Sequence, residues 1–267
     1  MPRLRPANDE RFAMILHIPL TAAILLALAL PAAAQMLALP IPPAEGQNQI
    51  SVKVTPGLTQ TRKLPTAALR QARKDMLAGL DIGDDDLRAL ADQGDGLAAL
   101  RYTRRLVASD AASASDIAYY GSLAVSTGRV WVLPDAVAAM ARLDPETEPA
   151  ERKKTYLAML YPHAWAGNAL ALDAVIDLNG EGRLFGAMSE ATRQKILEQG
   201  EKNGDGRAAL RLALPLLHKQ GRSATETAQL QDYLKRARAA GHLAVATTAD
   251  TMLALLADQT AGAAVTQ

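Results

Sequence analysis

Apolar residues recur at helical spacing along the chain from Pro65 onward, at intervals of three and four residues. This spacing predicts helices over 66–79, 85–93, 96–109, 113–127, 134–143, 148–161, 164–178, 189–202, 206–220, 224–239 and 242–257. Glycine closes helices in the left-handed conformation, and glycines stand at or near the breaks: Gly94, Gly128, Gly167, Gly204, Gly221 and Gly241. Short turns between such helices predict antiparallel hairpins in an all-α domain.

The segment before these helices has a different pattern. Prolines interrupt residues 35–65 repeatedly, and Ile50 to Thr55 alternate apolar and polar residues as a strand does. We expect a disordered linker here. The alternative is an extended tail that adds as a strand to the sheet of a partner.

The N-terminus has the pattern of a secretory signal peptide. An apolar run over 15–30 follows several arginines, and small residues up to Ala34 form a cleavage site. A membrane anchor is the alternative, but the run is short and contains His17 and Pro19. Met14 is an alternative start of translation. The sequence predicts a periplasmic or secreted protein with no membrane span after signal removal.

These patterns divide the chain into four parts. We expect a signal peptide over 1–34, a Pro-rich extended tail or linker over 35–65, a helical repeat domain over 66–258 and a flexible C-terminus over 259–267.

Internal similarity indicates repeats within the helical part. Residues 94–101 and 204–211 match at seven of eight positions, at an offset of 110. Related segments start at Gly167 and Gly241, and the intervals from 167 to 204 and from 204 to 241 are both 37 residues. A fixed period of this length is typical of helical-hairpin repeats, which bury their apolar faces against neighbouring units.

At these positions the chain resembles the Sel-one-like repeats of the tetratricopeptide superfamily. The resemblance is carried by the turn at 217–221 and by Tyr233-Leu234-Lys235-Arg236-Ala237 followed by Ala240-Gly241-His242. It is good over 164–257, fair over 85–109 and poor between them. The resemblance implies an α-solenoid of antiparallel hairpins that binds proteins as a scaffold, with exported bacterial members linked to envelope or polysaccharide assembly and its regulation.

Composition supports helices and excludes several function classes. Hydrophobic residues make up 49% of the chain and aromatic residues only 4%, with alanine and leucine dominant, which argues against sheet folds. The net charge is +1, and the three arginines and two acids of residues 1–34 account for it, which leaves the remainder neutral. Nucleic acid is therefore not an expected partner. The absence of cysteine excludes disulfides and zinc–thiolate sites.

The residues give no catalytic or metal-binding pattern. In the sequence, no other histidine and no carboxylate stands at clear metal-ligand spacing from His163, His218 or His242, so we interpret them as helix-end residues and expect neither a cofactor nor a metal. Two segments, 177–182 and 201–206, copy the first half of a calcium loop but lack its final glutamate. We interpret both as helix-turn residues and expect no enzyme.

One cluster of residues is a candidate binding surface. Tyrosine, tryptophan and arginine are enriched at interaction hot spots. The chain gathers such residues in its middle third: Arg101, Tyr102, Arg105, Tyr119, Tyr120, Trp131 and Trp165. Many of the rings are expected to fill the core, and the exposed remainder is the first candidate interface. A protein partner is our first hypothesis, an anionic polysaccharide the second and a hydrolase with paired carboxylates the third.

Overall fold

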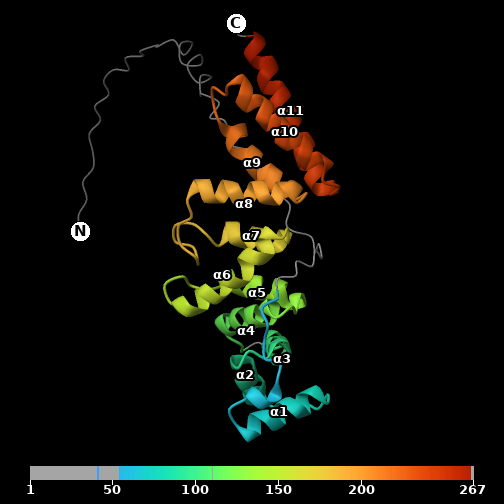
Figure 1. The fold of residues 1–267 in the computed structure, drawn as a ribbon. Helices are drawn as coiled ribbons and strands as arrows, with labels where there is room; N and C mark the ends of the chain where they lie inside the picture. The colour runs from blue at the N-terminus through green and yellow to red at the C-terminus, as the bar shows by residue number, and fades with distance from the viewer. Residues whose placement is uncertain (1–40, 42–53, 110, 266–267) are drawn as a thin grey trace, which may run out of the picture. The chain divides into compact units, whose positions relative to one another are not determined.

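The computed structural model describes residue 41, residues 54–109 and residues 111–265, with side chains described as far as residue 258. In this part of the chain the protein is all-helical, and no strand is present (Figure 1). Its elements are η1 (Thr61–Lys63), α1 (Ala67–Leu77), α2 (Asp84–Asp92), α3 (Gly96–Val107), α4 (Ala114–Ser126), η2 (Val130–Val132), α5 (Leu133–Met140), α6 (Ala150–Trp165), α7 (Ala169–Asp177), α8 (Glu190–Lys202), α9 (Gly206–His218), α10 (Ala224–Ala239) and α11 (Leu243–Val265). The predicted signal peptide lies outside the described residues.

Three helix boundaries differ from the sequence prediction by more than three residues, namely the end of α6, the start of α7 and the end of α11. A break was expected between residues 161 and 164, but α6 contains Pro162 and continues to Trp165. The break comes instead at Gly167, which has a φ of 92°, followed by Asn168, whose side chain caps α7. At the other end, α11 continues to Val265 through residues expected to form a flexible C-terminus. No proline follows residue 257 to stop that helix.

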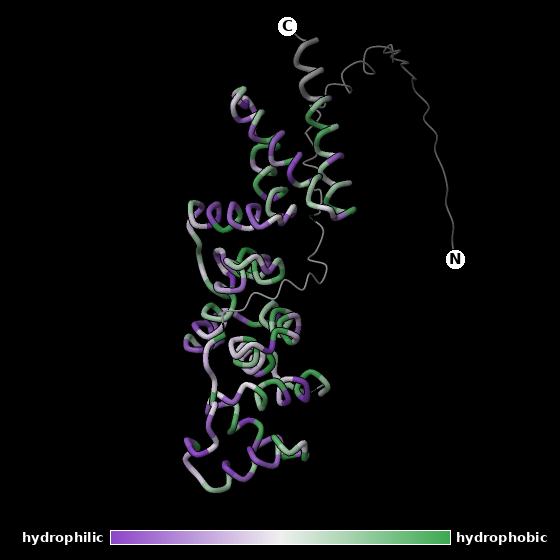
Figure 2. Tube along the Cα trace, turned by 45° about the vertical axis from the view of Figure 1, so that its right-hand side comes forward, coloured by the Kyte–Doolittle hydropathy of each residue, from purple (hydrophilic) through white to green (hydrophobic). Residues whose placement is uncertain are grey.

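The helices pack mainly on their neighbours in the chain. The successive pairs from α2 to α5, α6 with α7 and the successive pairs from α8 to α11 are in contact. Helices two apart also touch, namely α4 with α6, α5 with α7, α6 with α8, and α9 with α11. Buried residues form one cluster from Leu64 to Leu212 and a second from Ala209 to Leu256, so α9 contributes to both. Among these helices α8 is mostly hydrophilic in Figure 2 and buries only Ile196, Leu197 and Gly200.

The two matching sequence segments form matching helix junctions. Gly94 and Gly204 have φ values of 81° and 85°, a left-handed conformation that favours glycine. Asp95 then caps α3 by accepting hydrogen bonds from Leu97 N and Ala98 N, at 2.9 Å and 3.0 Å. Asp205 likewise caps α9 by accepting a hydrogen bond from the backbone N–H of its second residue at 3.0 Å. The sequence match therefore corresponds to the same local structure in two places.

Residues 54–64 are held against the helices, and we call them the strap. Thr55 N donates to Ser126 O, and Leu58 N donates to Gly94 O, both at 2.8 Å. Gly57 fits so closely that a Cβ there would lie 2.6 Å from the Gly94 carbonyl oxygen. The strap belongs to the segment expected to be a linker, and this part of it packs on the ends of α2 and α4.

A buried arginine fixes the strap to the first helices. Arg73 on α1 donates from Nε to Asp95 Oδ2 at 2.6 Å. Its Nη1 reaches Thr61 Oγ1 at 2.6 Å and its Nη2 reaches Leu58 O at 3.0 Å. One guanidinium thereby joins α1, the strap and the cap of α3.

None of the helices in the described ranges combines the length and the hydropathy that crossing a bilayer requires.

Burial of His163 on α6 is expected to make the protein less stable in mild acid. The side chain is 3% exposed, and burial lowers its pKa. An unfolded histidine takes up its proton near pH 6.5, so the unfolded state binds more protons below that pH. The stability that depends on neutral His163 is thus full above pH 6.5 and is lost as the pH falls toward the lowered pKa of the folded state.

Urea unfolding at pH 7.5 and pH 5.0 measures this effect. The loss of unfolding free energy between the two pH values should be smaller in His163→Asn than in the wild type. The exposed His218 provides the control, since His218→Asn should keep the full loss. An equal loss in wild type and His163→Asn would contradict the assignment.

Candidate functional site

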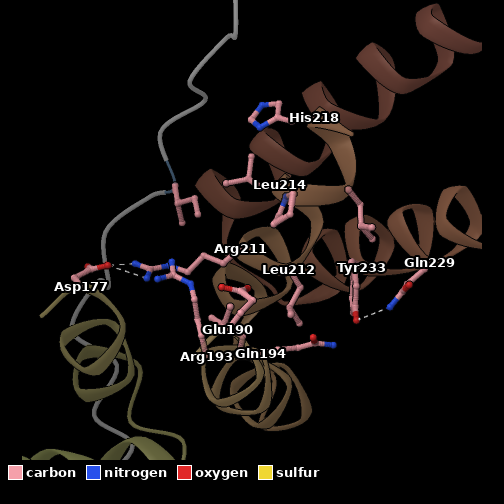
Figure 3. Close-up of a pocket in the computed structure, with 14 residues that line it drawn as sticks. Asp177, Glu190, Arg193, Gln194, Arg211, Leu212, Leu214, His218, Gln229 and Tyr233 are labelled. Carbon is pink, nitrogen blue, oxygen red and sulfur yellow. Dashed lines mark hydrogen bonds and ion pairs between the residues drawn. The ribbon is translucent and has the colours of Figure 1, made fainter. Parts of the chain in front are cut away.

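A groove of about 720 Å³ lies on α8, α9 and α10 (Figure 3). It is open to solvent, since several of its lining residues are exposed. The lining residues come from three helices, from the end of α7 and from one residue of the N-terminal segment: Ile41, Asp177, Glu190, Arg193, Gln194, Leu197, Arg211, Leu212, Leu214, Pro215, Leu216, His218, Gln229 and Tyr233.

The floor of the groove is apolar. Leu212 and Leu197 are buried, whereas Leu214 and Leu216 are partly exposed and pack on the C-terminal core cluster. The ring of Tyr233 packs against both core clusters, and its hydroxyl accepts a hydrogen bond from Gln229 Nε2 at 3.0 Å (Figure 3). The ring of Tyr233 and these leucines together form a surface that favours contact with an aliphatic side chain.

Ile41 is the one described residue of the N-terminal segment that lines this groove. It is partly buried and packs against the same cluster as Leu214, Leu216 and Tyr233. The groove therefore already contacts an apolar side chain from a distant part of the chain.

A row of ion pairs forms the wall of the groove next to α7. Arg211 binds Asp177 in a bidentate pair, with Nη1–Oδ1 at 2.9 Å and Nη2–Oδ2 at 3.3 Å (Figure 3). Behind it, Asp173 pairs with Arg211 at 3.3 Å and with Arg207. Burial raises the pKa of Asp173, although the two guanidinium groups act in the opposite direction. These pairs connect α7 to α9 and fix the position of Arg211 at the groove.

The first five residues of α8 contribute another part of the rim. Glu190 and Gln194 are exposed and Arg193 is partly exposed, and all three line the groove. The site thus combines an apolar floor with rims that carry both signs of charge. This arrangement can bind an extended segment with one apolar anchor.

The tyrosines expected at an interface are mostly core residues. Tyr102 and Tyr120 are 8% and 2% exposed, so their rings face the interior rather than a partner. Tyr120 contacts Tyr102 edge-to-face with centroids 4.8 Å apart, and Tyr119 with centroids 5.1 Å apart. Large rings between α3 and α4 fill the space that alanines leave there.

A polar network holds the buried hydroxyl group of Tyr120. The hydroxyl donates to Asp92 Oδ1 at 3.0 Å and accepts from Arg88 Nε at 3.1 Å. Burial, together with the hydrogen bond to Asp92, raises the pKa of Tyr120 to about 12. The half-exposed Tyr119 carries Arg152 over its ring, 4.7 Å from the centroid.

The other predicted site residues lie at the surface on separate elements. Trp131 in η2 is 70% exposed, and Trp165 at the end of α6 is 45% exposed. Arg105 is half-exposed and pairs with Asp81 and, at 2.5 Å, with Asp84, while Arg101 is half-exposed. Of the predicted set, Tyr102, Tyr119 and Tyr120 come together, and the two tryptophans remain as exposed rings.

The sequence pattern did not reveal the groove, although two residues that line it stand in the repeated motifs. Arg211 is the counterpart of Arg101 in the matched segments, at the offset of 110. Tyr233 stands in the motif that carries the family resemblance. No pattern near Ile41 predicts its place in the groove, because the other groove residues are more than 100 positions later in the sequence.

Three of the four acids of the two calcium-loop mimics have other contacts in the structure. Asp177 binds Arg211, Glu201 binds Arg236 at 2.9 Å, and Asp205 caps α9. In the described ranges, no cluster of three histidine or acidic side chains is arranged to hold a metal ion.

Comparison with known proteins gave no match, whether to protein-family models, to curated proteins or to solved structures.

Proposed function

We propose that this chain is an exported, non-catalytic scaffold that binds a protein partner through the groove on α8, α9 and α10. The helices are proposed to form tandem hairpins of the tetratricopeptide type, in the Sel-one-like branch. Contacts between helices two apart and the matching junctions at Gly94 and Gly204 support this architecture. The signal-like pattern of residues 1–34 supports export. A role in envelope or exopolysaccharide assembly rests on the family resemblance.

The observation that carries the protein-binding function is the chemistry of the groove. An apolar surface rimmed by charge marks a site for protein contact. Leucines and Tyr233 form the floor, and acidic and basic residues from α7, α8 and α9 form the rims. Such a surface suits a peptide segment, whose apolar side chain enters the floor while its polar groups meet the rims.

The two alternative functions have weaker support. A polysaccharide site is expected to present several aromatic faces, and Tyr233 is the one aromatic ring among the groove residues that the structure describes. Trp131 and Trp165 are the exposed rings that would serve a glycan. A hydrolase needs two facing carboxylates in an enclosed pocket, whereas Asp177 in the open groove is bound by Arg211.

Reversal of one charge on the groove rim is expected to weaken partner capture. Arg193→Glu should reduce the yield of the specific partner from an envelope extract at least about tenfold, because truncating or reversing a hot-spot charge costs 2 kcal/mol or more. The measurement is quantitative mass spectrometry of proteins retained by the immobilised wild type and variant.

Lys195→Glu is the matched control, since it makes the same charge change on the same helix at an exposed position that does not line the groove. It should retain the partner at the wild-type level. A partner lost equally from both variants would place the interface elsewhere. Retention of glycan alone, abolished in Trp131→Ala with Trp165→Ala, would replace this proposal with polysaccharide binding.

A further inference from the structure

We propose that the groove on α8, α9 and α10 is occupied in cis by this chain's own N-terminal segment around Ile41, which a partner segment must displace. The proposal rests on the proposed function for the identity of the competitor. The contact between Ile41 and the groove does not depend on that function.

Ile41 lines the groove and is partly buried. It packs against the C-terminal core cluster, as do Leu214, Leu216 and Tyr233, which line the same groove. An aliphatic side chain that leaves water for such a surface stabilises the contact in proportion to the apolar area that it buries. The apolar floor thus has a ligand of the chemistry it favours.

Prolines flank Ile41 on both sides in the sequence. Proline precedes it at position 40 and follows it at positions 42 and 43. A residue before proline is restricted to extended backbone, and each proline fixes its own φ. A segment restricted in this way loses little conformational entropy when it docks, as in the recognition of proline-rich peptides by shallow grooves. The groove therefore fits an extended, proline-flanked aliphatic residue.

A short linker connects Ile41 to the strap. Chain positions 41 and 54 are 54 − 41 = 13 residues apart, and the strap that starts at residue 54 is hydrogen-bonded to α4 and to the junction at Gly94. A short linker raises the effective concentration of its free end to the order of 1 mM. A contact that would be weak between separate molecules is therefore well populated within the chain.

The internal segment is proposed to compete with a partner segment for the groove. A partner segment that uses the same floor binds more weakly when the internal segment is present, by a factor of about 1 plus the ratio of effective concentration to the dissociation constant of the free segment. With a dissociation constant of about 0.1 mM and an effective concentration of about 1 mM, the factor is about ten. The N-terminal segment sets the threshold affinity that a partner must exceed.

The test uses a fluorescein-labelled peptide of residues 37–46 as the probe and the full chain as the receptor, with fluorescence anisotropy as the readout. Ile41→Asp should bind the peptide about tenfold more tightly than the wild type, because the cis competitor is disabled. Tyr233→Ala added to Ile41→Asp should abolish this binding. A peptide with aspartate in place of its isoleucine should not bind either receptor.

Leu243→Asp is the matched control, since it places the same charge at a residue that is 85% exposed and outside the groove. It should bind the peptide as weakly as the wild type. Equal affinity of wild type and Ile41→Asp, or no binding to either at millimolar peptide, would overturn the proposal. Circular dichroism of each variant confirms that the helices are intact.

The capture experiment and the peptide-binding experiment distinguish failure of the scaffold function from failure of the cis contact. If the peptide binds as expected but Arg193→Glu captures the same proteins as the wild type, the cis contact stands and the scaffold function at this groove fails. If Arg193→Glu loses the partner but the peptide does not discriminate between the receptors, the groove binds a partner without internal competition.

Discussion

Replacing Gly206 with valine is expected to lower the free energy of unfolding by about 3 kcal/mol, because it forces side-chain atoms into a packed helix junction. A Cβ at this position would lie 2.6 Å from Ala240 Cβ and 2.9 Å from the Ala237 carbonyl oxygen. The second of these is backbone, so relief requires α9 to move away from α10. The residues that would separate belong to the C-terminal core cluster, on α9, α10 and α11.

Hydrogen exchange followed by mass spectrometry measures both the size and the location of the effect. In Gly206→Val, the amides of α9, α10 and α11 should exchange faster, while those of α2, α3 and α4 stay protected, because the helices pack mainly on their neighbours in the chain. Gly83→Ala is the control: a Cβ there meets nothing within 4 Å, and the change should be nearly neutral. A uniform loss of protection along the chain would argue against local coupling between neighbouring helices.

Replacing Arg73 with leucine is expected to cost about 3–5 kcal/mol, because it leaves a buried carboxylate without its cation. Asp95 is 3% exposed, and Arg73 is its ion-pair partner at 2.6 Å. Leu58 O and Thr61 Oγ1 lose a donor at the same time. The strap should therefore detach, in addition to the loss of stability in α1 and α3.

Urea unfolding gives the change in free energy, and limited trypsin digestion reports the strap. Arg62 and Lys63 are exposed in η1, and the wild-type contacts should protect the bonds after them. Cleavage there should be faster in Arg73→Leu by at least about tenfold, as expected when local opening becomes easier by more than 1.4 kcal/mol. Lys74→Leu changes an exposed neighbour on α1 and should leave cleavage at 62 and 63 unchanged. Equal cleavage in both variants would show that Arg73 does not hold the strap.

The all-helical fold could be predicted because its signals are local. Alanine and leucine periodicity marks the helices, and glycine followed by aspartate marks the junctions at 94–95 and 204–205. The break predicted between residues 161 and 164 was wrong for a local reason as well, because Pro162 lies inside α6. Proline lacks one donor, but Ala166 N donates to Pro162 O at 3.1 Å, so the hydrogen-bond pattern resumes after one gap.

The strap and the groove could not be predicted because their contacts are distant in sequence. Nothing near Leu58 indicates that Arg73 and Gly94 will bind it. The candidate surface drawn from residue types mixed buried and exposed rings, since composition alone does not separate Tyr120 from Trp131. The offset between Arg101 and Arg211 and the motif that contains Tyr233 are the sequence features that coincide with the groove.

The strap also bears on the order in which the chain folds. Thr55 N pairs with Ser126 O, which is 126 − 55 = 71 residues later in the chain. During synthesis residues 54–64 emerge first, yet α4 must be complete before they have their full binding site. Most other contacts join adjacent helices and form quickly, whereas this one closes a long loop. We therefore expect strap docking to be a late event, and a nascent chain halted before α4 to expose an unattached N-terminal segment.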